Sequence, residues 1–84
     1  MGTRRVIVGA SALKHGIAEE DVREAAQTAL IDGSLDDENP QRRLRIGFNT
    51  RARLLEIVVL VWGDGTEEVI HAMKCRPQYL AFLD

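Results

Sequence analysis

The clearest hydrophobic pattern in the chain is the run Leu54–Trp62, in which every residue except Glu56 is apolar. Many of these residues are β-branched, and the run is too apolar on both faces to be an exposed edge. It therefore predicts an interior strand of a sheet. Gly63-Asp64-Gly65 follows, and because Asp-Gly favours tight hairpin turns, the next strand is predicted over Thr66–Cys75.

A second segment, Arg43–Phe48, alternates strictly between polar and apolar residues. Leu44, Ile46 and Phe48 share one face, and Arg43 and Arg45 share the other. The pattern predicts a strand with one wet side. Asn49–Ala52 is a plausible hairpin connection from this strand to the Leu54 run.

The segment Ala18–Leu30 has helical periodicity instead. Negative charge in its first turn, Glu19–Asp21, suits the positive end of a helix dipole. The apolar face is mostly alanine and predicts close packing against a sheet. It consists of Ala18, Val22, Ala25, Ala26 and Ala29.

The remaining segments predict loops and short elements. Asp36–Pro40 is a polar loop with strong turn chemistry. Ser11–His15 is either a short helical turn or the tail of a strand, and the pattern does not separate the two. Pro77 suits the first turn of a short closing helix. The residues expected to dock from that helix are Tyr79, Leu80, Phe82 and Leu83.

Together these elements predict one α+β domain over residues 1–84. Its antiparallel sheet of three to four strands is packed by an N-terminal helix and a short C-terminal helix. No apolar run approaches the roughly 20 residues that a membrane helix needs. A single cysteine, Cys75, rules out an intramolecular disulfide, and the simplest expectation is a reducing, cytoplasmic setting.

Charge is unevenly distributed along the chain. The net charge of -2 counts against a nucleic-acid binder. However, Glu19–Glu38 holds eight acids against Arg23 alone, whereas Arg42–Arg53 holds five arginines and no acid. A folded surface can keep an acidic and a basic segment apart.

The most suggestive chemistry lies in Val69–Arg76, which carries His71, Lys74 and Arg76. Such a strand end can bind a phosphodiester, with the cations stabilising negative charge and the histidine moving a proton. Strand alternation places His71 on the face opposite Lys74 and Arg76. A satisfied surface histidine is the favoured alternative for His71, and for Lys74 and Arg76 ordinary surface charge is as well supported as anion contact. No metal-ligand spacing is present, and no cofactor is predicted.

Two further candidates are basic. Lys14-His15-Gly16 precedes the helix, and its alternative reading is a polar helix entry. The other candidate is a possible RNA-facing stripe, because arginines on one strand face can follow phosphates. Solvent or an acidic partner protein is slightly favoured for it over RNA, because stacking aromatic residues are missing nearby. The stripe consists of Arg43, Arg45, Arg51 and Arg53.

Several of these segments, in this order and spacing, resemble BrnT-type toxins of the RelE-like group of type II toxin–antitoxin ribonucleases. The resemblance covers His15 to Arg76. It rests on His15-Gly16-Ile17 before an acidic helix, Arg42-Arg43 ending a loop, Leu44-Arg45-Ile46-Gly47, Leu54–Val61 and Ile70-His71-Ala72-Met73-Lys74.

The resemblance implies a RelE-like fold and an RNA-cleaving toxin held inactive by a small antitoxin that also binds operator DNA. It further implies attack by a ribose 2′-hydroxyl without metal. Lys74 and His15 match family positions, whereas Met73 stands where an arginine is usual and Ala18 where a capping serine is common. Loss of that cation weakens phosphate stabilisation, so a weakly active or non-catalytic descendant is also consistent.

The sequence thus supports two hypotheses. As an endoribonuclease, Lys74 and Arg76 would stabilise the phosphate, His15 or His71 would transfer the proton, and RNA would lie on the stripe and Lys14. As a non-catalytic module of the same fold, the Arg43–Arg53 segment or an exposed edge strand would pair with another protein or a second copy of the chain.

Overall fold

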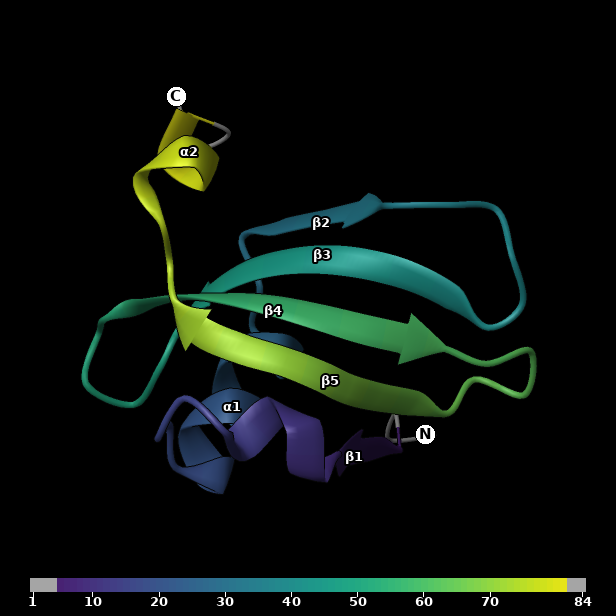
Figure 1. The fold of residues 1–84 in the computed structure, drawn as a ribbon, viewed down its shortest axis with the longest axis horizontal. Coiled ribbons are helices and arrows are strands. Elements are labelled where there is room, and N and C mark those ends of the chain that lie inside the picture. Colours follow the sequence, from purple (N-terminus) through teal and green to yellow (C-terminus); the bar gives the residue numbers. More distant parts are fainter. Residues whose placement is uncertain (1–4, 82–84) are drawn as a thin grey trace.

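A computed structural model describes residues 5–81 and contains one five-stranded mixed sheet (Figure 1). The strand order is β1-β5-β4-β3-β2. The strands are β1 (Val6–Val8), β2 (Ile31–Ser34), β3 (Gln41–Phe48), β4 (Leu54–Val61) and β5 (Glu67–Lys74). The helical elements are the 3-10 helix η1 (Ala10–Leu13), α1 (Glu19–Gln27) and α2 (Pro77–Leu80).

The central position of β4 confirms the interpretation of the Leu54 run. It pairs antiparallel with β3 on one side and β5 on the other. Both predicted connections are present. Gly65 closes the β4–β5 hairpin with φ of 90°, and Asn49 spans the β3–β4 turn by a backbone hydrogen bond of 2.8 Å from its N–H to the carbonyl of Arg53.

The prediction of a purely antiparallel sheet of three or four strands was wrong. β1 pairs parallel with β5, and β2 pairs antiparallel with β3. Each added strand has only three or four residues, too few to show a period. The open alternative for Ser11–His15 also resolves, because η1 makes this region a short helical turn.

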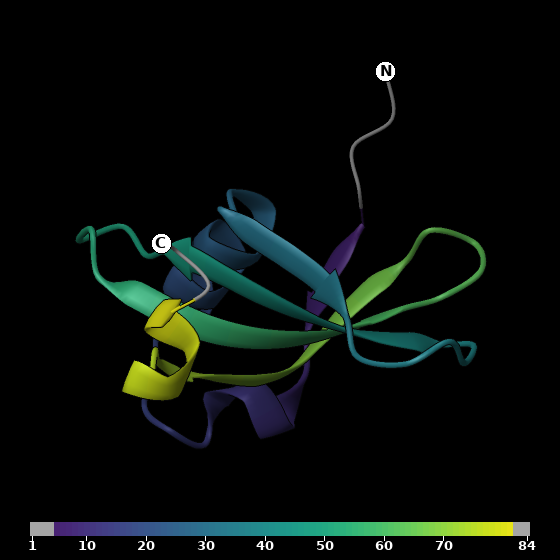
Figure 2. The ribbon, with the colours of Figure 1, turned by 90° about the horizontal axis from the view of Figure 1, so that it is seen from above.

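Helix α1 packs on one face of the sheet (Figure 2), and its alanine face permits the close approach that the sequence predicts. Ala25 and Ala26 are buried against Ile57 and Val59 of β4. Gly47 of β3 lies so close that a Cβ there would meet the Ala25 carbonyl oxygen at 2.4 Å. In contrast, no residue of α2 is buried, Leu80 is 41% exposed, and Phe82 and Leu83 lie outside the described residues.

The face of β3 predicted to be wet is the one that α1 covers, so this prediction was wrong for Arg45. Its side chain is 3% exposed and donates to both carboxylate oxygens of Glu67 at 2.7 Å. It also donates to the Ala26 carbonyl at 3.2 Å, which ties α1 to β3. Alternation identifies the side of a strand, but it does not reveal what covers that side.

Candidate functional site

The centre of the candidate site is Glu56, the one charged residue within the apolar β4 run. Its side chain is 1% exposed, yet both carboxylate oxygens are fully engaged. Arg76 donates from its backbone N–H at 3.0 Å, from Nε at 2.9 Å and from Nη2 at 2.8 Å. His71 Nε2 lies 3.0 Å from Oε2. A buried charge requires such partners, and Glu56 has them.

The ionisation of Glu56 fixes the orientation of His71. Burial opposes the charged form, but hydrogen bonds from Arg76 and His71 outweigh it and lower the pKa of Glu56 below its ordinary value. An ionised carboxylate only accepts hydrogen bonds, so Nε2 of His71 carries a hydrogen. In the neutral imidazole, Nδ1 then holds the free lone pair.

Two histidines that are far apart in sequence meet at this site. The rings of His15 and His71 are in edge contact, with centroids 5.6 Å apart. His15 lies in the turn between η1 and α1 and is exposed. The His71 side chain is less accessible, with 25% of its surface exposed. Strand β5 and the turn before α1 therefore bring two imidazoles together at the surface.

Arg76 joins His71 although strand alternation predicts opposite faces. β5 ends at Lys74, and the extended backbone of Arg76 turns the chain back towards Glu56. The guanidinium also lies 5.4 Å from the centre of the Tyr79 ring. Hydrogen bonding to Glu56 raises the pKa of Arg76, which remains charged.

Lys74 does not join this cluster. It lines a separate cavity of about 370 Å³ together with Arg53, Leu54 and Leu80. Arg51 and Arg53 line an adjoining cavity of about 310 Å³. Lys14 is exposed immediately before His15. The predicted cations are therefore dispersed. Arg51, Arg53 and Lys74 lie at the cavities, and Arg43 and Arg45 lie on β3. Arg76 binds Glu56, and Lys14 is exposed beside His15.

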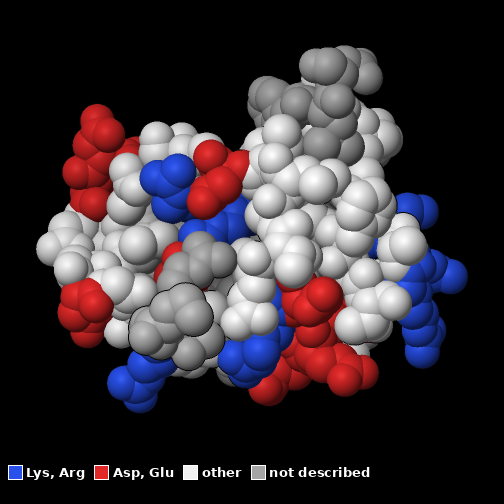
Figure 3. Space-filling view, turned by 180° about the vertical axis from the view of Figure 1, so that it is seen from behind, with Lys and Arg blue, Asp and Glu red and all other residues white. Residues whose placement is uncertain are grey.

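The arginines of β3 are paired with acids and do not form a free stripe. Arg43 binds Asp32 at 2.7 Å, and Arg45 binds Asp32 and Glu67. The neighbouring Arg42 binds Asp36 at 2.7 Å. Figure 3 shows basic and acidic side chains next to one another at several places on one face. The acidic and basic segments are thus not kept apart here, and buried Arg45 is unavailable to RNA.

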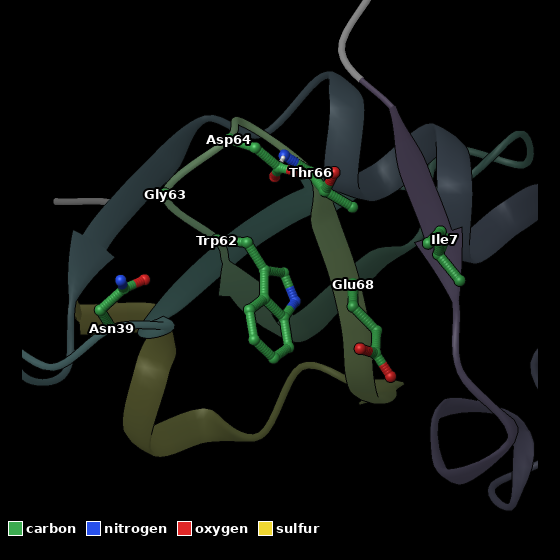
Figure 4. Close-up of a pocket in the computed structure, with 7 residues that line it drawn as sticks. All are labelled: Ile7, Asn39, Trp62, Gly63, Asp64, Thr66 and Glu68. Atoms are coloured by element: carbon green, nitrogen blue, oxygen red, sulfur yellow. Dashed lines mark hydrogen bonds between the residues drawn. The ribbon is translucent and has the colours of Figure 1, made fainter.

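A third cavity, of about 400 Å³, lies at the other end of the sheet around Trp62 (Figure 4). The indole lies between Asn39 and Glu68, with Asp64 above it in this view. Its ionisable lining residues, Asp64 and Glu68, are both acidic. Negative charge disfavours phosphate binding here, so the cavity is a weaker candidate than the histidine cluster.

Glu56 is the functional candidate that sequence reasoning missed. The available signal was a lone carboxylate within an apolar strand, since a buried charge is rare without partners. Its partners were hidden because Arg76 lies beyond the end of β5. Among residues 5–81, the structure contains no group of three or more histidine, cysteine, aspartate or glutamate residues that could hold a metal ion.

Comparison with known proteins does not assign the chain to a family. No family model, curated protein or solved structure matches this chain. Across the described part of the chain, none of the helices is long and apolar enough to cross a membrane.

Proposed function

We propose that this chain is a metal-independent endoribonuclease of the toxin type, acting at the cluster of His15, His71, Glu56 and Arg76. The observation that carries the proposal is the contact between His15 and His71 beside the Glu56–Arg76 pair. RNA cleavage by the 2′-hydroxyl needs one group to remove a proton and another to supply one. Two adjacent surface imidazoles meet that need.

In the proposed reaction, the 2′-hydroxyl loses its proton to His71 as its oxygen attacks the neighbouring phosphorus. The new O2′–P bond forms while the P–O5′ bond breaks, and His15 gives a proton to the departing O5′. The products are a 2′,3′-cyclic phosphate and a 5′-hydroxyl. Water, metal and oxidant take no part, so the step balances.

The hydrogen bonding of His71 supports these roles. Glu56 holds Nε2 of His71, which leaves Nδ1 as the base. The Glu56 and Arg76 charges offset each other, so Glu56 acts on His71 mainly by orienting it. His15, exposed and without a carboxylate partner among the described residues, supplies the proton. Arg76 is 45% exposed and binds the same carboxylate as His71, so we expect it to stabilise the phosphate charge.

Single-stranded RNA incubated with purified protein in a metal chelator tests the proposal. We expect cleavage to 2′,3′-cyclic phosphate ends. His71→Asn or His15→Asn should lower kcat by about 10²- to 10⁴-fold, the usual contribution of general acid–base catalysis. Glu56→Gln should also lower kcat, because the amide no longer holds the productive tautomer.

Arg5→Gln is the matched control, since this exposed residue lies beside β1, away from the cluster. Induction in cells extends the test to ribosome-bound RNA. Unchanged growth with intact RNA, both free and on ribosomes, would exclude the ribonuclease proposal.

One observation favours the alternative of a protein–protein module. Leu30 and Leu35 flank the edge strand β2 and are 58% and 49% exposed. An edge strand with neighbouring apolar side chains can pair with an antitoxin or a second copy of the chain. Sedimentation of the protein alone and with its genomic neighbour tests this. A protein that stays monomeric and does not bind the product of the neighbouring gene would contradict the protein–protein alternative.

A further inference from the structure

A groove lies at the end of the sheet where β5 finishes. Its lining includes Ile17 and Cys75, which are close in sequence to His15 and Arg76 of the candidate site. Its two cavities share Ile17, Asn49 and Arg53, so they form one continuous depression. Their volumes, about 370 and 310 Å³, lie at the lower end of the range for small-ligand sites, roughly 300–1,000 Å³.

The groove carries positive charge that the protein does not use internally. Arg53 and Lys74 are exposed, and within residues 5–81 neither forms an ion pair. The arginines of β3 differ, because each has a carboxylate within 4 Å. The acid in the adjoining cavity, Asp21, is engaged by the N–H and hydroxyl of Thr50. Arg53 and Lys74 are therefore available to an anion.

The walls between these cations are apolar. Ile17 and Leu54 are partly buried, and Leu80 of α2 is 41% exposed at the rim. An anion with an apolar, flat body fits this combination better than inorganic phosphate does. A nucleotide has both parts, and in single-stranded RNA its base is free to leave the stack.

We propose that this groove binds one nucleotide of single-stranded RNA beside the scissile phosphate. Arg53 and Lys74 hold its phosphate, and Ile17, Leu54 and Leu80 contact its base. The position of the groove beside the cleavage site rests on the proposed function, whereas nucleotide binding itself does not. The groove gives Lys74 a role in positioning RNA, separate from the proton transfer at His71.

The test uses the whole protein and a short single-stranded oligonucleotide with 2′-deoxyribose, which cannot be cleaved by this route. We expect Arg53→Gln and Lys74→Gln each to weaken binding by about tenfold, the value of a charge-assisted hydrogen bond. The dependence of log affinity on log salt should flatten by about 0.7 for each lost contact. Arg5→Gln is the matched control and should bind like the unaltered protein.

A second probe tests the apolar walls. An oligonucleotide with one abasic position should bind the unaltered protein less tightly, and Leu80→Ser should remove this difference. Equal affinities for Arg53→Gln, Lys74→Gln and Arg5→Gln would overturn the proposal, as would equal binding of the abasic probe.

These results are separable from the ribonuclease proposal. His71→Asn should bind the uncleavable probe normally, while Arg53→Gln should raise KM for RNA and leave kcat nearly unchanged. If RNA stays intact but probe binding depends on Arg53 and Lys74, the groove proposal is kept and the ribonuclease proposal is rejected. If cleavage needs His71 but neither cleavage nor probe binding depends on Arg53 or Lys74, the ribonuclease proposal is kept and the groove proposal is rejected.

Discussion

Glu56 shows how one residue can organise a site from within an apolar strand. Taking a carboxylate out of water costs several kcal/mol, which the four hydrogen bonds from Arg76 and His71 must offset. The same bonds orient the imidazole and draw the chain after β5 back over the sheet. Glu56 therefore links stability and site geometry, and a change at this position is expected to affect both.

The lowered pKa of Glu56 predicts a specific acid sensitivity. A carboxyl whose pKa is lower in the folded than in the unfolded chain stabilises the fold above the ordinary value of 4.5. This contribution is lost as pH falls through the folded value. Urea unfolding from neutral pH to about pH 3 should show a smaller decline in unfolding free energy for Glu56→Gln than for the unaltered protein.

The comparison with Glu56→Gln is needed because other carboxyls titrate in the same range. Hydrogen bonds from Thr50 and Arg42 lower the pKa values of Asp21 and Asp36, and those groups are common to both proteins. Only the difference between the two curves reports Glu56. Parallel curves over the whole pH range would show that its pKa is not lowered in the folded protein.

At the scale of elements, the fold depends on how closely α1 approaches β3. The alanine face of α1 meets Gly47, and the helix backbone occupies the space of a side chain. Arg45 then binds the carbonyl of Ala26 from the same strand. Because small residues on both elements allow this close approach, the Arg45 guanidinium can reach a backbone carbonyl of the helix.

Gly47→Ala tests this close approach. The added methyl would lie 2.4 Å from the Ala25 carbonyl oxygen, so α1 must shift, and we expect a loss of about 1–3 kcal/mol in unfolding free energy. Gly33→Ala in β2 is the control, since no atom of residues 5–81 lies within 4 Å of its Cβ position, and its effect should stay within about 1 kcal/mol. Equal effects in urea unfolding would contradict the packing argument.

A feature could be predicted from the sequence when the residues that determine it lie close together along the chain. The interior strand, its hairpins and the alanine-faced helix depend on neighbouring residues, and these predictions were confirmed. Strands β1 and β2 are defined by pairing with distant segments. The burial of Arg45 depends on α1, which covers it. For the site, His15, His71 and Arg76 were found as residue types, but Glu56, which gathers His71 and Arg76, depends on long-range contacts.

At the scale of the whole molecule, the basic groove and the Trp62 cavity lie at opposite ends of the sheet. Arg53 and Lys74 lie where β4 begins and β5 ends, whereas Asp64 and Glu68 lie near the β4–β5 hairpin. An eight-residue strand separates these ends by about 25 Å, well beyond the Debye length of about 8 Å at physiological salt. The net charge of -2 therefore does not describe the surface that RNA would meet.

This separation yields a test that needs no substitution. Trp62 is the only tryptophan, is 41% exposed and lies at the end of the sheet away from the groove. Stacking of a base on an aromatic ring is worth about 1–3 kcal/mol, so RNA bound there should change the indole emission. If RNA binds the groove at the other end, tryptophan fluorescence should stay constant while anisotropy of a labelled, uncleavable oligonucleotide rises to saturation. Saturable quenching that follows the anisotropy curve would place RNA at the Trp62 cavity, and the basic groove would then not be its binding site.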